Sequence, residues 1–311
     1  MAEKMATRQA YGKALVELGA RNPNLVVMDA DLSKSTMTAE FGKTYPERFF
    51  NMGIAEQNLY GAAAGLALSG KVVCASTFAM FATGRAFEII RNSIGYTKAN
   101  VKICATHAGI TVGEDGASHQ TFEDIALMRT IPGMTVINPS DGVSAKKLLE
   151  QAVEMYGPCY VRLGRAAVPV FYDESADITL GKANTIREGK DVTVIATGIM
   201  VNEAFIAAEK LAAEGIDVRV IDIHTIKPID SDAIIKAAEE TRAIVTAEEH
   251  SIVGGLGSAV AEVVVKNAPV KMAMVGQQDT YGESGKPDQL KEKYGMTSAD
   301  IINAVKSVLQ R

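Results

Sequence analysis

Short apolar runs alternate with helical segments along the whole chain, and this alternation limits the possible folds more than any other feature. In the first half, apolar runs of strand length lie at 25–28, 72–74, 101–105, 135–137 and 160–163. Segments with helical spacing lie between them at 7–22, 57–68, 79–94, 122–129 and 141–155, the last with Ser140 as its expected N-cap. This order predicts βαβ units and a mainly parallel sheet with helices on both faces.

A second set of strands and helices follows a stretch of different composition. Residues 167–190 contain Pro169 and an acidic pair but no clear period, which is typical of a linker. Beyond them, strands are predicted at 192–196, 218–221, 243–247 and 270–275, and helices at 202–214, 231–239, 256–266, 286–294 and 298–310. Thr297 and Asp300 are spaced as in a capping box. We therefore expect two α/β domains, residues 1–166 and 191–311, each with three αβα layers.

Charge and hydropathy exclude several classes of function. The net charge is −5, and no run of Lys or Arg suggests a nucleic-acid partner. The N-terminal residues lack the apolar region of a secretory signal, and no apolar stretch is long enough to span a membrane. Cys74, Cys104 and Cys159 lie in strand-like apolar runs and are predicted to be reduced and buried. We expect a cytoplasmic protein that binds neither nucleic acid nor membrane.

One carboxylate, Glu56, stands where a helix rich in Ala and Gly is predicted to begin. Its neighbours are Met, Ile and Ala, and no Lys or Arg follows within one helical turn. A carboxyl group in such surroundings is expected to lose its hydration and to hold or share a proton, as general acid–base chemistry requires. From the residues alone, a helix-start Glu that only complements the helix dipole is the alternative.

The loop at 106–120 follows a predicted buried strand and is unusually rich in polar side chains. It contains His107, Glu114, Asp115 and His119 together with three glycines. Glycines permit backbone turns that direct side chains to one target, and imidazoles with a carboxylate can bind sugar hydroxyls or phosphate and relay protons. A metal site formed by the two His and Asp115 is an alternative, although the spacing fits no standard zinc pattern. A purely structural loop is the other alternative.

Two long motifs in these stretches resemble a known family. Asn-Met-Gly-Ile-Ala-Glu-Gln-Asn at 51–58 and Gly-Glu-Asp-Gly-Ala-Ser-His-Gln at 113–120 resemble transketolase, a thiamine-diphosphate enzyme. The resemblance covers essentially the whole chain but only the C-terminal half of a full-length transketolase, namely its pyrimidine-binding domain and its C-terminal domain. It implies the transfer of a two-carbon ketol unit between sugar phosphates in the pentose phosphate pathway.

The resemblance also implies which residues bind the cofactor. Glu56 matches the residue that hydrogen-bonds a ring nitrogen of the aminopyrimidine and so promotes the tautomer that removes the reactive proton. Two aromatic side chains match positions that stack on this flat ring. The residues expected to contact thiamine diphosphate are Glu56, Phe78, Phe81, Asp31 and Ile54, with Asp31 near the thiazolium side.

The substrate residues follow from the same resemblance. Arginines offer forked donors to phosphate oxygens, and Arg162 competes with Arg165 for this role. The residues expected to bind the sugar phosphate are Arg8, Ser35, His107, Asp115, His119 and Arg165. Together with Glu56, His107 and His119 are the expected catalytic residues.

The motif that binds the cofactor's pyrophosphate is missing. In this family a metal ion held by Gly-Asp-Gly and a later Asn binds the pyrophosphate, whereas Glu114-Asp115-Gly116 and Ser140-Asp141-Gly142 lack the first Gly. We therefore expect no metal site in this chain. A separate N-terminal transketolase subunit is expected to carry the motif with Mg²⁺ or Ca²⁺, in a heterotetramer of α₂β₂ type.

Other functions remain as alternatives. The β subunit of a 2-oxo acid dehydrogenase E1 component has similar domains but lacks the loop that contains His107. Half of a 1-deoxyxylulose-5-phosphate synthase is closer, and a catalytically silent binding module is a third alternative. The glycines at 254–257 resemble a dinucleotide loop without its third Gly. His224 and His250 are expected to be structural.

Overall fold

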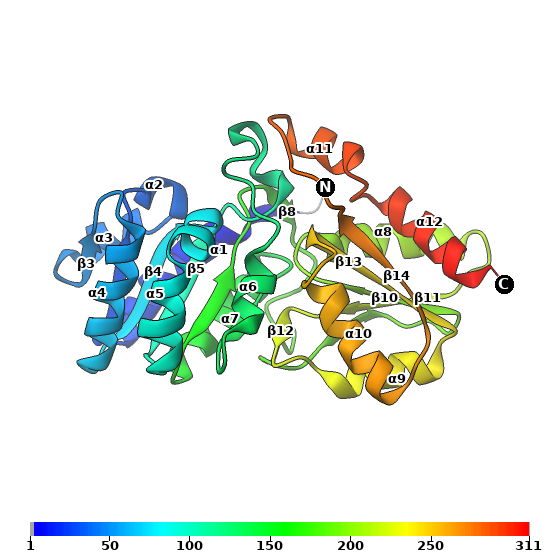
Figure 1. Cartoon of the computed structure of the whole chain (residues 1–311), viewed down its shortest axis with the longest axis horizontal. Helices are drawn as coiled ribbons and strands as arrows, with labels where there is room; N and C mark the ends of the chain where they lie inside the picture. The colour runs from blue at the N-terminus through cyan, green and yellow to red at the C-terminus, as the bar shows by residue number, and fades with distance from the viewer. Residues whose placement is uncertain (1–2, 311) are drawn as a thin grey trace.

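The sheet of the first domain has seven strands in the order β12-β6-β7-β5-β4-β2-β3 in the computed structural model, which describes residues 3–310 (Figure 1). Every neighbouring pair is parallel except β12 and β6. The strands are β2 (Leu25–Asp29), β3 (Phe49–Asn51), β4 (Val72–Phe78), β5 (Val101–Thr106), β6 (Thr135–Ile137), β7 (Cys159–Arg162) and β12 (Thr225–Lys227). Because β12 comes from the second half of the sequence, the two halves share this sheet.

Helices cover both faces of this sheet, as the sequence predicts. Along β2, Leu25 and Val27 pack under the helices of one face, and Val26 and Met28 pack under those of the other. A strand that is buried on both faces is therefore a continuous apolar run. On one face lie α1 (Thr7–Arg21), α3 (Ala39–Thr44) and α7 (Gly142–Glu154); on the other lie α4 (Glu56–Leu68), α5 (Phe87–Ile89) and α6 (Asp124–Thr130).

The second domain is a smaller sandwich of the same kind. Its sheet has the order β14-β13-β10-β11-β9 and is parallel except for β9. The strands are β9 (Asn184–Arg187), β10 (Val192–Ala196), β11 (Val218–Asp222), β13 (Ala243–Ser251) and β14 (Lys271–Gln277). One face carries α8 (Met200–Ala212) and α12 (Ser298–Leu309), and the other carries α9 (Ser231–Glu240) and α10 (Leu256–Asn267). The predicted α/β fold with two αβα domains is confirmed.

The stretch predicted as a linker contains two short strands that the sequence analysis did not identify. β8 (Ala167–Pro169) pairs with β1 (Lys4–Ala6) in a separate antiparallel ribbon, and β9 extends the second sheet. Strands of three or four residues at a sheet edge are too short to show a period. The division at residues 166 and 191 stays a prediction.

Two local predictions were wrong. The N-cap of α7 is Asp141 rather than Ser140, because the Asp141 carboxylate accepts a hydrogen bond from the Ser144 amide at 2.8 Å. The helix predicted at 79–94 is divided into η2 (Phe81–Arg85), α5 and η3 (Ile90–Tyr96). η2 and η3 have wider π-helical turns, which often occur at functional sites.

The remaining features concern single residues and the membrane question. Cys74, Cys104 and Cys159 are buried and free, as predicted. The Asp300 carboxylate accepts hydrogen bonds from the amide and the hydroxyl of Thr297, which confirms the capping box. Within residues 3–310, no helix combines the length and the apolar character that crossing a membrane requires.

Candidate functional site

Most of the predicted site residues lie at the edge of the first sheet where its parallel strands end. β4 ends at Phe78, which pairs in register with Thr106 at the end of β5. His107 follows directly, so the sheet itself brings Phe78 and His107 together. Ligand sites in parallel α/β sheets form at this edge.

Four rings form a continuous wall at this edge. The Phe78 ring stacks on His107 with 3.8 Å between ring centroids, and on Phe81 with 6.0 Å. His119 presents its edge to the Phe81 ring at 5.2 Å. Phe78 is almost fully buried, whereas Phe81 and His119 are half-buried. The exposed parts of the wall can therefore contact a ligand.

Glu56 is held against this wall by a residue that sequence reasoning missed. Its side chain is only 2% exposed at the first turn of α4, and its Oε2 accepts a hydrogen bond from Arg85 Nη1 at 2.8 Å. The Arg85 guanidinium also lies over the Phe81 ring, 4.7 Å from its centroid. Arg85 is 29 positions from Glu56. Because Arg85 lies far outside the helical turn that follows Glu56, the local sequence around Glu56 does not reveal this partner.

Two arginines, Arg8 and Arg165, lie near His107. Burial and the positive charges of Arg8 and Arg165 lower the pKa of His107 to about 3, so its imidazole is neutral at physiological pH. Arg8 donates a hydrogen bond to the Ser35 carbonyl at 2.6 Å, and Arg165 pairs with Glu114 at 2.8 Å. The Arg8 Nε atom is buried and has no partner within residues 3–310. Two neighbouring guanidinium groups make this part of the site attractive to an anion.

Arg162, the alternative to Arg165 for binding phosphate, forms a buried ion pair instead. It is 3% exposed, and its Nε donates to Asp124 Oδ2 at 2.6 Å. Its Nη2 donates to the carbonyl of Glu249 in the second domain at 2.8 Å. Arg162 is therefore part of the domain junction, and Arg165 is the arginine that remains near His107.

Asp31, Ser35, Ile54 and Asp115 are not part of the ring wall and lie in loops and short helices that follow β2 or β5 or precede α4. The Asn51 side chain joins the loop after β2 to the loop before α4, because its Oδ1 accepts hydrogen bonds from the amides of Asp31 and Gly53 at 3.0 Å each. Asn51 Nδ2 donates to the Asp31 carboxylate at 3.2 Å. Ile54 is 79% exposed, and Asp115 is exposed at the end of η4 (Ile110–Asp115).

Asp29 is a second residue that sequence reasoning missed. Its buried carboxylate accepts hydrogen bonds from the Leu32 amide and from the hydroxyls of Thr36 and Thr38, at 2.6 to 2.9 Å. Burial raises the pKa of Asp29 against these hydrogen bonds. The carboxylate thus shapes the loop that carries Asp31 and Ser35. A strand that ends in Asp beside a Thr-rich loop is a signal from which this role was predictable.

The metal and nucleotide alternatives gain no support from the geometry. Within residues 3–310, no group of three His, Cys, Asp or Glu side chains could hold a metal ion. At the glycines before α10, the Glu248 carboxylate accepts hydrogen bonds from the amides of Leu256 and Gly257 at 2.6 and 2.7 Å. It occupies the place that a nucleotide phosphate would take. His224 and His250 are fully buried, which suits their expected structural role.

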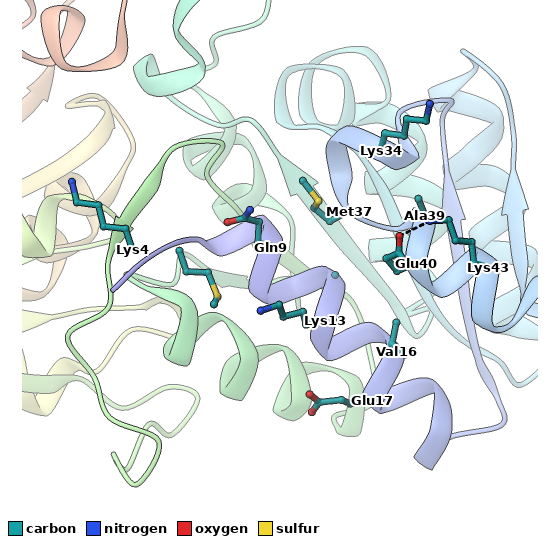
Figure 2. A pocket seen from close by; sticks show the side chains of 12 residues that line it. Lys4, Gln9, Lys13, Val16, Glu17, Lys34, Met37, Ala39, Glu40 and Lys43 are labelled. Atoms are coloured by element: carbon teal, nitrogen blue, oxygen red, sulfur yellow. Dashed lines mark hydrogen bonds and ion pairs between the residues drawn. The ribbon is translucent and has the colours of Figure 1, made fainter. Parts of the chain in front are cut away.

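A groove of about 1020 Å³ lies on the same domain, between α1 and the segment that contains α2 (Ser33–Thr36) and α3 (Figure 2). Gln9 and Lys34 are among the residues that line the groove. They follow Arg8 and precede Ser35 in the chain, and Arg8 and Ser35 are joined by a hydrogen bond. Four lysines line it, together with the two acids Glu17 and Glu40. Both acids are paired, Glu40 with Lys43 and Glu17 with Lys146. Lys4, Lys13 and Lys34 form no ion pair among residues 3–310, so unpaired positive charge borders an otherwise apolar groove, whose fourth lysine, Lys43, is paired with Glu40.

The fold and the site together define an α/β protein with two αβα domains and a candidate ligand site at the edge of the larger sheet. Residues 3–170 match the family model "Transketolase, pyrimidine binding domain", and residues 181–301 match "Transketolase, C-terminal domain". The chain belongs to the transketolase family, and the resemblance inferred from the two motifs is confirmed.

Individual relatives agree with this assignment. The chain is 50% identical to a putative transketolase C-terminal section of Methanocaldococcus jannaschii, over 98% of this chain and 96% of that protein. It is 42% identical to a 6-deoxy-6-sulfo-D-fructose transketolase subunit of Clostridium sp. (strain MSTE9), over 98% and 94%. A solved structure described as "Split gene transketolase, inactive beta4 tetramer" superposes with a TM-score of 0.92 at 55% identity, over 98% of both chains. All three relatives match over nearly their full length.

The residues present fit the pyrimidine half of thiamine diphosphate. Arg85 contacts both the buried Glu56 carboxylate and the partly exposed Phe81 ring, so a hydrogen-bonding group and a stacking surface lie near each other, as a hydrogen-bonding and stacking heterocycle requires. The part of the chain that the structure describes holds no acidic cluster for the metal ion that would bind the pyrophosphate.

Proposed function

We propose that this chain is the C-terminal subunit of a split transketolase, which transfers a two-carbon ketol unit between ketose and aldose phosphates. One observation carries the proposal: a buried helix-start carboxylate, an aromatic wall and a pair of arginines lie together at one sheet edge, in a chain whose relatives are transketolase sections. The cofactor we infer is thiamine diphosphate. When bound, it supplies the electron sink for cleavage of the carbon–carbon bond.

Glu56 and the ring wall would act on the pyrimidine side. The Glu56 carboxyl would hold a proton at a ring nitrogen of the cofactor, and Phe81 with Phe78 behind it would stack on the ring. Asp31 and the exposed Ile54 would approach the rest of the cofactor from the loops that Asn51 joins. Arg85 must release Glu56 for this contact to form, and its half-exposed side chain is free to move away.

His107 and the arginines would act on the substrate side. The neutral His107 imidazole can accept a hydrogen bond from a sugar hydroxyl, which an imidazolium cannot do. Arg8, Arg165 and the Ser35 hydroxyl would hold the anionic end of the sugar. His119 and Asp115 would reach hydroxyls nearer the reacting carbons, and we assign His119 a share in proton transfer.

A sulfonated sugar is a second candidate substrate. The relative from Clostridium is described as acting on 6-deoxy-6-sulfo-D-fructose. A sulfonate is an anion with three acceptor oxygens, and two arginines can bind it as well as a phosphate. Because Arg8 and Arg165 can bind either anion, a sugar phosphate and a sulfonated sugar both remain candidate substrates. Competition kinetics can separate them.

A second kind of subunit would complete the site. We propose an N-terminal transketolase subunit that carries the Gly-Asp-Gly…Asn motif with Mg²⁺ or Ca²⁺, in an assembly of α₂β₂ type. The solved relative described as an inactive tetramer of β chains supports the need for another chain. The exposed Ile54 and the lysine-rimmed groove give this partner an apolar contact and a place for an acidic segment (Figure 2). Three free buried cysteines suit a reducing compartment, and we propose the cytoplasm.

The test is to mix the purified chain with the candidate partner, thiamine diphosphate and Mg²⁺. We expect turnover of xylulose 5-phosphate with ribose 5-phosphate, and none of pyruvate with glyceraldehyde 3-phosphate. Turnover only of the second pair would indicate a deoxyxylulose-phosphate synthase. Full turnover by this chain alone would refute the need for a partner.

A further inference from the structure

The second domain holds the loop of the first domain that carries the substrate residues. The Thr111 amide, in the first turn of η4, donates a hydrogen bond to Oε1 of Glu249 in β13 at 2.7 Å. Glu249 is 3% exposed, so water does not replace this contact. η4 also packs against α11 (Pro287–Lys293), which lies above the junction of the two domains in Figure 1.

The backbone of the loop is shaped around the Glu249 carboxylate. Gly109 has φ of +81°, and a Cβ atom there would overlap the Glu249 carboxyl group. Only glycine adopts this positive φ without strain and also leaves room for the Glu249 carboxyl group. At the other end of the loop, Gln120 Nε2 donates to the Glu283 carbonyl of the second domain at 2.9 Å. The second domain thus fixes the loop at two points.

The loop in turn fixes the groups that face the substrate. Arg165 Nη1 donates to the Val112 carbonyl at 2.6 Å and to the Glu114 carboxylate at 2.8 Å, and both acceptors belong to η4. His107 stands two residues before Gly109. A shift of η4 would therefore move Arg165 and release the chain that follows His107.

We propose that Glu249 is a positioning residue for substrate binding: its carboxylate sets η4, and η4 sets Arg165 and His107 against the anionic end of the sugar. This inference rests on the proposed function for what is bound. It gives the second domain a part in binding substrate, although that domain contributes no residue to the ring wall.

A plain structural role at the domain junction is the competing explanation, and the neighbouring residue provides the control. Glu248 is as deeply buried as Glu249, and burial raises the pKa of both carboxyls. The Glu248 carboxylate bonds the amides of Leu256 and Gly257 and does not bond η4. Glu248→Ala should therefore weaken the second domain while it leaves the loop in place.

Hydrogen exchange of the full chain tests the geometry without any need for activity. In Glu249→Ala we expect amides at 109–116 to exchange at least roughly tenfold faster, because the buried hydrogen bond from the Thr111 amide to the Glu249 carboxyl oxygen is lost. Glu249→Gln, which keeps the acceptor oxygen, should restore most of the protection, and Glu248→Ala should leave these amides unchanged. Equal exchange of this segment in the wild-type chain and Glu249→Ala would overturn the proposal.

Kinetics of the enzyme reconstituted with its partner test the consequence. Glu249→Ala should raise the KM for the sugar phosphate roughly tenfold, with kcat and the Kd of thiamine diphosphate changed less than about threefold. An equal rise of KM in Glu248→Ala would overturn the positioning role. Absence of turnover in the wild-type mixture would instead refute the proposed function, and the exchange experiment would still decide the position of η4.

Discussion

Asp222 makes the stability of the chain depend on pH in a way that a single substitution can test. It lies at the end of β11 and is fully buried at the domain junction. Its Oδ2 accepts hydrogen bonds from the Ser140 hydroxyl at 2.6 Å and from the Tyr172 hydroxyl at 3.0 Å, whereas its Oδ1 has no partner among residues 3–310. Burial, together with the nearby Asp141 charge, raises the pKa of Asp222 to about 7 against these two hydrogen bonds.

The sign and size of the effect follow from this pKa. The ordinary pKa of an Asp, 3.8, applies to the unfolded chain, so the pKa of Asp222 is about 3 higher in the folded chain, which corresponds to about 4 kcal/mol. Below pH ~4 the carboxyl group is protonated in both states, and its contribution to stability is fully present. Between pH ~4 and ~7 only the unfolded chain releases the proton, so this contribution is lost as the pH rises.

Urea denaturation of the wild-type chain and of Asp222→Asn, at several pH values from 4 to 8, measures this loss. The difference in unfolding free energy, wild type minus variant, should fall by about 4 kcal/mol over this range. Titrating groups that do not interact with Asp222 are common to both chains and cancel. Glu154→Gln, at the exposed end of α7, is the control and should give a flat difference. Parallel curves for the wild type and Asp222→Asn would refute the reasoning.

Three further predictions concern the arginines. Arg162→Met should destabilise the chain by about 3–5 kcal/mol in urea denaturation, because it leaves the buried Asp124 carboxylate without its ion pair; a loss below ~1 kcal/mol would contradict this. Arg85→Ala should tighten thiamine diphosphate binding in the assembled enzyme by up to about fivefold, measured by calorimetry, because a half-exposed ion pair of at most ~1 kcal/mol no longer competes for Glu56; weaker binding would show that Arg85 itself holds the cofactor. Arg165→Ala should raise the KM for sugar phosphates in steady-state assays while the Kd of the cofactor stays the same; equal weakening of both would place Arg165 elsewhere in the site.

The sequence predicts those strands best that are buried on both faces. β6 and β10 were predicted with their observed ends, and β10 lies between the polar residues Asp191 and Thr197. β4 was predicted three residues long and has seven, since Ser76 and Thr77 are polar but buried in the sheet. The Ser76 hydroxyl is satisfied by Tyr11 of α1 at 2.7 Å, a partner 65 positions away. Polar residues with distant partners are where local patterns fail.

The same limit applies to the site. Motifs at 51–58 and 113–120 place Glu56 and His119, because each motif is contiguous in the sequence. Arg85 and Glu249 stayed hidden, because one lies 29 positions from Glu56 and the other 138 positions from Thr111. No local pattern marks such contacts, and only the folded chain brings them together.

The measurement that most directly tests the role of Glu56 is the turnover of Glu56→Gln with the partner subunit, thiamine diphosphate and Mg²⁺. The amide keeps the size and the hydrogen-bonding capacity of the side chain but cannot hold or release the proton. We predict that the rate of ketol transfer falls by about 10²- to 10⁴-fold, while sedimentation shows the same assembly as the wild type. Turnover within about threefold of the wild type would contradict the assignment of Glu56 as the proton partner of the cofactor.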